Sequence, residues 1–158
     1  MAVYLHYDGI DGEATHEDHK KWIDIGSVQF GIGRGISTPV GSAANREASQ
    51  PSVSEIVVTK SMDSASPKLF TESATGSAGK TVKIDLVSTG SPGVTYAQYT
   101  LTNTLISGYS VSSGGDRPSE SISLNFTKIE YKLTPTDANN KEGTPVTVSY
   151  DLSTGKSG

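Results

Sequence analysis

Alternation between apolar and polar residues is the dominant pattern in this chain. An alternation with period two is typical of β-strands that have one buried and one exposed face. It occurs in six stretches: residues 3–7, 22–32, 81–86, 96–111, 121–133 and 146–152. The pattern predicts a mainly β protein. At 158 residues we expect a single domain over residues 1–158, with 152–158 as a frayed tail.

Two of these stretches change phase part-way along. Leu105 and Ile106 are adjacent apolar residues in the fourth stretch, and in the fifth the apolar positions exchange faces near Thr127 and Lys128. A shift of one residue turns the buried face outwards, and a β-bulge is the usual cause. Both stretches are therefore expected to bend, as in a small barrel or in a strand that leaves its own domain.

One short helix is predicted after the strand at Ile56–Val58, whose apolar residues on both faces indicate that both faces are covered. The helix start is indicated by three candidate N-caps and a first-turn proline, namely Asp63, Ser64, Ser66 and Pro67. An apolar stripe is expected at Leu69, Phe70 and Ser73, and the end of the helix at Gly76. We expect this helix to cap the open end or side of a β-barrel.

Residues 33–51 have almost no periodicity and contain two prolines. A loop of this length inside a compact domain is uncommon and is usually either functional or disordered. Its charged residues, Arg34, Arg46 and Glu47, are the obvious polar anchors. A mobile insertion and a functional protrusion are both compatible with the residues alone.

Composition narrows the range of functions. The chain has no cysteine, so disulfides, thiol nucleophiles and thiolate metal sites are excluded. Its net charge is −4 and it has no basic run, which argues against nucleic-acid binding. No stretch approaches the ~20 apolar residues that span a membrane, and the first residues lack the features of a signal peptide. We therefore expect no nucleic-acid partner and no membrane insertion.

No catalytic, cofactor or metal site stands out from the background. His16 and His19 are three residues apart, but a metal site needs a third ligand and a shaped pocket, so a solvent-exposed segment is the favoured interpretation. The chain also lacks a GxSxG elbow and a complete phosphate-binding glycine loop. We predict a protein that is not an enzyme and that holds no cofactor or metal.

Binding or assembly is the class of function that is left. Only 34% of the residues are hydrophobic, which is little for a self-contained core. A lean core, a long loop and strands that change their buried face suit a subunit whose surface is completed by copies of itself. A second interpretation, a monomeric carbohydrate-binding β-domain, is equally compatible with composition.

Four segments, in order, resemble the Hcp (haemolysin-coregulated protein) family, the tube proteins of type VI secretion systems. They are YLHYDGIDGEATHEDHKKWIDI at residues 4–25, VTKSMDSASPKLF at 58–70, YAQYTLTNTLISGYSVSSGG at 96–115 and GGDRPSESISLNFTKIEYKLTP at 114–135. The last is the most specific, because its Arg-Pro, Leu-Asn-Phe and Lys-Ile-Glu pieces all stand where the family has them.

The resemblance implies a two-sheet β-barrel with one short flanking α-helix and a long protruding loop. It implies hexameric rings stacked into a tube, which spike and sheath proteins help to expel from the bacterial cytoplasm without a signal peptide. Small effector proteins would travel in the lumen; a mainly effector-binding carrier ring is the alternative. Within this picture we assign Arg34, Arg46 and Glu47 to ring stacking, and Ser112 and Ser113 to lumen or cargo contact.

Overall fold

Strands make up about half of the computed structural model, which describes residues 1–41, 44, 46–90, 93–139 and 141–158. Within these residues there is one helix, α1 (Ser66–Thr75). The strands are β1 (Ala2–Tyr7), β2 (Ile23–Ile25), β3 (Ser27–Gln29), β4 (Ile32–Gly33), β5 (Ile36–Ser37), β6 (Glu47–Ala48), β7 (Ser52–Val53), β8 (Ile56–Ser61), β9 (Lys80–Val87), β10 (Thr95–Ser112), β11 (Ser119–Asn125), β12 (Lys128–Leu133), β13 (Val146–Asp151) and β14 (Lys156–Ser157). None of the described helical residues forms a segment long and apolar enough to span a membrane.

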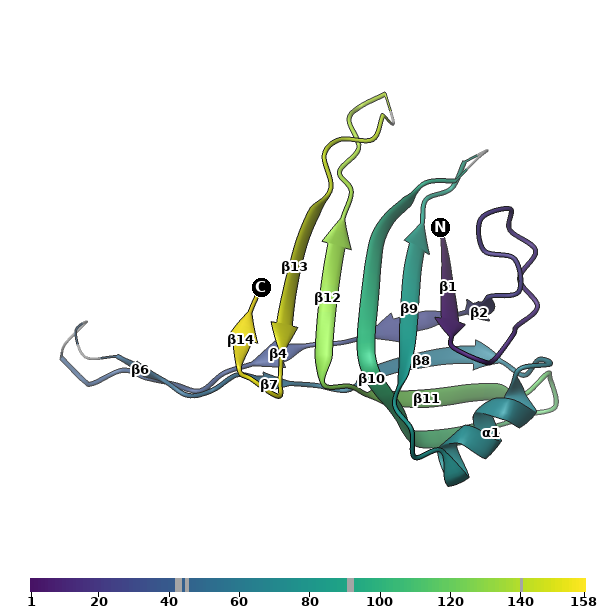
Figure 1. The fold of residues 1–158 in the computed structure, drawn as a ribbon, viewed down its shortest axis with the longest axis horizontal. Coiled ribbons are helices and arrows are strands. Elements are labelled where there is room, and N and C mark those ends of the chain that lie inside the picture. The colour runs from purple at the N-terminus through teal and green to yellow at the C-terminus, as the bar shows by residue number, and fades with distance from the viewer. Residues whose placement is uncertain (42–43, 45, 91–92, 140) are drawn as a thin grey trace.

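Two antiparallel sheets share the long strand β10 (Figure 1). The first has the order β2-β1-β9-β10-β12-β13-β14, and the second has the order β10-β11-β8-β3. The first half of β10 pairs with β9 and β12, and its second half pairs with β11. Strand β10 therefore leaves one sheet and enters the other along its own length.

The predicted phase changes mark these passages between sheets, and both are confirmed. In β10 the β9 ladder shifts between Leu101 and Thr104, where Asn103 adopts a left-handed φ of 55°, and the β11 ladder shifts between Ile106 and Gly108. Asparagine tolerates this conformation better than most residues, so it suits the bend. The second phase change lies between β11, in the second sheet, and β12, in the first.

The two sheets do not close into the expected barrel. Among the described residues the ladder ends at β2 on one side and at β3 on the other. The single strand predicted over residues 22–32 is therefore wrong. Strand β2 pairs with β1, whereas β3 pairs with β8, and the chain passes between the sheets at Gly26, whose N–H donates to the Thr59 carbonyl at 2.7 Å.

The core lies between the two sheets and beneath α1. Its most deeply buried members include Leu5, Ile56, Val58, Leu69, Val82, Ile84, Leu101 and Leu124. Helix α1 contributes Leu69, but Phe70 is 61% exposed, so the predicted apolar stripe is only partly correct. The N-cap is Ala65 rather than one of the predicted polar residues. Asp63, two residues before it, instead accepts a hydrogen bond from the Ala65 N–H through its side chain at 3.0 Å. Gly76 ends the helix, as predicted.

The described part of residues 31–54, which we call the arm, forms a narrow hairpin that extends away from the body (Figure 1). Strand β4 pairs with β7 and β5 pairs with β6, so the stretch in which we expected a long protruding loop contains two short ladders. The predicted frayed tail also differs from the structure. Strand β14 pairs with β13, and Ser149 and Gly158 exchange two backbone hydrogen bonds of 2.9 and 3.0 Å.

Candidate functional site

An apolar face of the first sheet extends beyond the core without a cover. Residues opposite each other in a ladder, and residues two apart along a strand, share one face of a sheet. By this rule the core residue Ile129 shares its face with Leu133, Val146 and Val148. Ile129 is buried, but those three are 39%, 60% and 55% exposed. We call Leu133, Val146 and Val148 the overhang; exposed apolar patches of this kind often mark interaction surfaces.

The arm carries all three residues that we assigned to ring stacking. Arg46 donates from Nε to Thr38 Oγ1 across the hairpin at 3.2 Å, and Glu47 lies in β6 opposite Ser37. The ladder places Glu47 on the face opposite to Ile36, while Arg34 lies between β4 and β5. All three charged residues are exposed. The structure therefore gathers them on one protruding element, and their role in stacking stays a prediction.

Ser112 and Ser113 lie far from the arm, at the turn between β10 and β11 (Figure 1). Ser112 pairs with Ser119 at the end of the ladder, and Ser113 donates from Oγ to the Asp116 carbonyl at 3.3 Å. Both serines are exposed. The predicted residues therefore form two groups at opposite ends of the molecule, and cargo contact at the serines stays a prediction.

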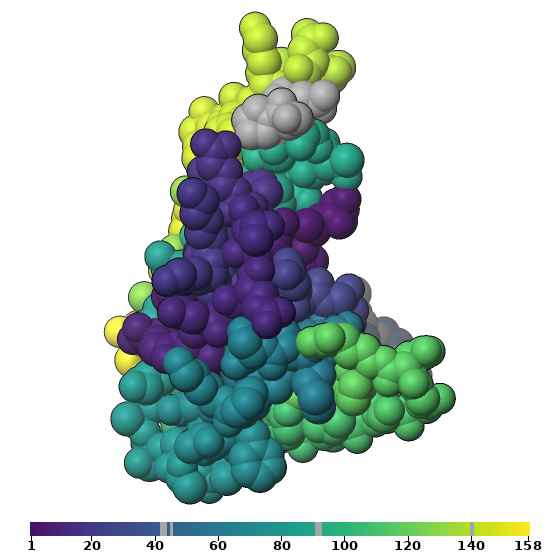
Figure 2. Space-filling view, turned by 90° about the vertical axis from the view of Figure 1, so that its right-hand side faces the viewer, coloured from purple at the N-terminus to yellow at the C-terminus, as the bar shows by residue number. Residues whose placement is uncertain are grey.

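The end of the molecule that carries this turn also contains a polar cleft of about 500 Å³. Figure 2 shows this end, where the N-terminal segment, the region of β8 and α1, and the β10–β11 turn come together. Three carboxylates line the cleft, from Glu13, Asp24 and Asp63. Partial desolvation, together with the negative charges of Asp63 and Glu13, raises the pKa of Asp24. Arg117, also on the cleft wall, donates from Nε to the Met62 carbonyl at 2.6 Å.

A buried ion pair that we did not predict lies behind this cleft. Lys60 Nζ is 2.7 Å from Glu120 Oε1, and both side chains are 0% exposed. Lys60 also contacts Asp63 at 2.8 Å, while Ser66 and Tyr109 donate to the Glu120 carboxylate. The pair thus joins β8, β11 and the start of α1. The sequence contained a signal for it, since both charges stand at positions where the strand alternation calls for an apolar residue.

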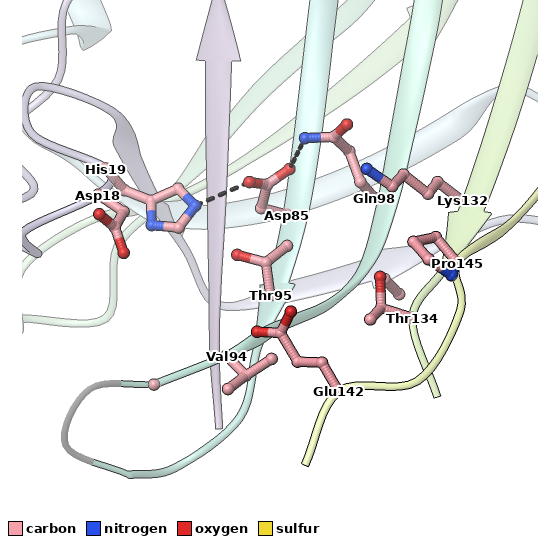
Figure 3. A pocket seen from close by; sticks show the side chains of 12 residues that line it. Asp18, His19, Asp85, Val94, Thr95, Gln98, Lys132, Thr134, Glu142 and Pro145 are labelled. Carbon is pink, nitrogen blue, oxygen red and sulfur yellow. Dashed lines mark hydrogen bonds and ion pairs between the residues drawn. The ribbon is translucent and has the colours of Figure 1, made fainter. Parts of the chain in front are cut away.

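A second polar cluster lies on the outer face of the first sheet. The ladders place Tyr4, Asp85, Gln98 and Lys132 in one row across β1, β9, β10 and β12. His19 Nε2 lies 2.7 Å from Asp85 Oδ2, and Gln98 donates to Asp85 Oδ1 at 2.7 Å (Figure 3). His19 is only 2% exposed, so the prediction of a solvent-exposed segment is wrong at this histidine. Asp85 is buried, so the prediction of a solvent-exposed face on β9 is wrong at this position.

His19 and Asp85 form part of the wall of a pocket of about 420 Å³, together with Asp18, Lys132 and Glu142 (Figure 3). The described residues contain no group of three or more His, Asp or Glu side chains that is arranged to hold a metal ion. The polar atoms of His19, Asp85 and Gln98 that meet in this cluster hydrogen-bond to one another.

Residues 4–133 match the family model described as "Type VI secretion system effector, Hcp". The chain belongs to the Hcp family. The resemblance seen in the sequence is therefore confirmed. Hcp proteins are secreted structural proteins of the type VI secretion tube, and membership supports a role in such a tube, with self-association.

Solved structures of Hcp proteins share the fold. A type six secretion system protein is 27% identical, with 99% of each chain covered and a TM-score of 0.91. Hcp1 from Salmonella typhimurium is 24% identical over 99% of this chain and 97% of that one, with a TM-score of 0.79. A type VI secretion system effector from Yersinia pestis is 22% identical over 94% and 98%, with a TM-score of 0.74. Curated proteins gave no significant match.

Proposed function

We propose that this chain is the structural subunit of a type VI secretion tube. Six copies close into a ring, rings stack into a tube, and the tube is expelled with small effector proteins in its lumen. The subunit acts as one domain over residues 1–158 and performs no catalysis. Spike and sheath proteins are its other partners, and it resides in the bacterial cytoplasm until the system fires.

The overhang is the observation that carries this proposal. The face of the first sheet that is buried in the core at Ile129 continues to Val146 and Val148, where it is exposed. Burying apolar surface stabilises a contact by about 25 cal/mol per Å², so a second copy that covers this face is favoured. A ring needs a head-to-tail contact in which one patch meets a different patch of the next copy. The overhang supplies one such patch.

The arm supplies a different contact, between rings. It extends from one end of the subunit with Arg34 and Arg46, and the cleft with Glu13, Asp24 and Asp63 opens at the other end (Figures 1 and 2). Opposite charges at opposite ends favour a head-to-tail stack of rings, because complementary potentials select the partner and its orientation. Ser112 and Ser113 lie at the same end as the cleft, and we assign them to contact with cargo.

The ring is tested with Val148→Glu, which places a charge in the overhang. We expect the wild-type protein to elute as a hexamer and to form rings with a central hole in electron micrographs, and the variant to elute as a folded monomer. Thr147→Glu is the matched control, because Thr147 lies on the same strand but on its other face, and it should keep the rings. A wild-type protein that stays monomeric at every concentration, or a Val148→Glu protein that still forms rings, would contradict the proposal.

A further inference from the structure

The histidines of the segment between β1 and β2 contact each other directly. His19 Nδ1 and His16 Nδ1 are 2.9 Å apart, and His19 Nε2 is bonded to Asp85. At this distance one of the two Nδ1 atoms must donate a proton and the other must accept it. Because His19 Nε2 donates to a carboxylate, the neutral arrangement has His16 Nδ1–H as the donor and His19 Nδ1 as the acceptor.

This contact holds the segment of residues 13–22 on the sheet. Tyr4 of β1 stacks on His19 with ring centroids 4.8 Å apart and also faces His16 at 5.3 Å, while the Trp22 ring meets His19 edge-on at 4.7 Å. Within the segment the backbone closes on itself, since Ala14 donates to the Trp22 carbonyl and Lys21 donates to the Ala14 carbonyl, both at 2.9 Å. Two further contacts hold the ends of the segment: the Trp22 ring lies 5.3 Å from the His6 ring on β1, and Glu13 accepts the Ser64 N–H at 3.2 Å.

The charged and titratable groups around the pair come from four elements and the segment itself. They are Asp85 on β9, Lys132 on β12, Tyr4 and His6 on β1, Glu142 in the connection before β13, and Glu17, Asp18, Lys20 and Lys21 on the segment. Among these groups only the Asp85 carboxylate is bonded to a ring of the pair.

The number of protons that the pair can hold is limited by its geometry. One added proton is accommodated, because it binds His16 Nε2 and leaves the Nδ1–H···Nδ1 contact in place. A second added proton must go to His19 Nδ1, and then two N–H groups on two positive rings face each other at 2.9 Å. Like charges at this distance repel, and neither nitrogen has a lone pair left to accept a hydrogen bond. The contact must therefore open when both rings are charged.

We propose that His16, His19 and Asp85 form an acid-released latch. At neutral pH the latch keeps residues 13–22 on the sheet, and in acid the doubly charged pair separates and releases this segment. Because Asp18 and His19 form part of the pocket wall, release also opens the pocket between the segment and the β12–β13 connection. The latch lies within one subunit and does not rest on ring formation.

Hydrogen exchange on the full-length protein tests the latch. We compare the backbone amides of Ala14 and Lys21 at neutral pH and at about pH 5, the range in which histidines change charge, after correction for intrinsic exchange rates. The wild-type amides should exchange at least ~10-fold faster in acid, as local opening predicts. The fluorescence of Trp22, the single tryptophan, should change over the same pH range.

His16→Gln is the decisive variant. Glutamine can donate to a neutral His19 or accept from a charged one, and it cannot itself become charged, so the segment should stay closed in acid and its amides should keep their protection. His6→Gln, which removes the third histidine but leaves the His16–His19 contact, should keep the acid opening of the Ala14 and Lys21 amides. Equal wild-type protection at both pH values, or acid opening that persists in His16→Gln, would overturn the proposal.

Discussion

At the scale of single residues, Tyr7 shows how burial changes the chemistry of a side chain. Tyr7 is almost fully buried at the end of β1. Burial, followed by the negative charge of Glu72 on α1, raises the pKa of Tyr7 from 10.0 to about 12. The folded protein therefore binds the phenol proton more tightly than the unfolded chain does.

This shift predicts a loss of stability in alkali. Below about pH 10 the phenol is protonated in both states and Tyr7 adds no pH dependence, but between about pH 10 and 12 only the unfolded state releases its proton, so the free energy of unfolding falls as pH rises. Two pKa units correspond to roughly 2–3 kcal/mol as an upper bound. Chemical denaturation at about pH 9 and 11 should show a smaller loss for Tyr7→Phe than for the wild type.

Tyr96→Phe is the matched control for this measurement. Tyr96 lies near the start of β10, partly exposed, and its hydroxyl contacts the Met1 sulfur at 3.0 Å. We expect Tyr96→Phe to lose as much stability in alkali as the wild type does. An equal loss in the Tyr7→Phe protein would mean that other groups account for the alkaline dependence.

At the scale of elements, the Lys60–Glu120 pair decides how α1 and the second sheet fit together. Lys60→Met leaves the Glu120 carboxylate buried without its cation, and breaking a buried pair in this way costs about 3–5 kcal/mol. The double variant Lys60→Met/Glu120→Leu also removes the buried Glu120 charge and leaves only Asp63, at the cleft, without its cation, so it should recover part of this loss. Equilibrium denaturation in urea of both variants and of the wild type gives the comparison.

The order of stabilities is the informative result. The double variant should lie between the single variant and the wild type, because it removes the unpaired Glu120 charge but also the carboxylate to which Ser66 and Tyr109 donate. If the single and double variants were equally unstable, removing the Glu120 carboxylate would bring no net gain, and the prediction that its unpaired charge dominates the loss would be contradicted.

Sequence patterns predicted the elements whose signals are local. The bends at Leu105–Ile106 and at Thr127–Lys128 were visible because a change of face interrupts the alternation within a few residues. The passage at Gly26 was missed although the apolar positions change there from Ile23 and Ile25 in β2 to Val28 in β3, because the prediction treated residues 22–32 as one strand. The strand pairing inside the arm was missed because each of its ladders pairs only two residues per strand, all on a largely exposed hairpin.

The polar clusters depend on partners that are distant in the chain. His19 meets Asp85 across 66 residues, and no local pattern links the two. Lys60 and Glu120 are 60 residues apart, but each interrupts an apolar alternation, so a charge at a core position was a usable signal. The position of Arg46 and Glu47 on a protruding element was predicted correctly, because the family resemblance places a long protrusion there.

At the scale of the whole molecule, the two ends of the subunit differ in shape and charge. The arm extends from one end with Arg34 and Arg46, and the cleft with Asp24 opens at the other (Figures 1 and 2). If these ends meet in a stack, reversing the charge at either end should weaken stacking. We therefore expect Arg46→Glu and Asp24→Arg each to shorten tubes in electron micrographs while the rings elute intact.

The double variant Arg46→Glu/Asp24→Arg makes this prediction specific. The two reversed charges again attract across the contact, so tubes should lengthen relative to both single variants. Lys141→Glu, an exposed reversal in the β12–β13 connection, should leave stacking unchanged. Raising the salt concentration should shorten wild-type tubes, because the screening length falls from about 10 Å at 0.1 M salt to about 3 Å at 1 M.

Each contrary result removes a different part of the assignment. If Arg46→Glu eluted as a monomer, the arm would belong to the contact within rings, and the overhang and the arm would both serve ring closure. If rings persisted and tubes shortened but the double variant failed to recover, the arm would still join rings, and the charge that receives Arg46 would lie elsewhere than at Asp24. Only one outcome, recovery of tube length in the double variant, requires the arm of one ring to reach the acidic end of the next. That outcome fixes a head-to-tail orientation for the stack.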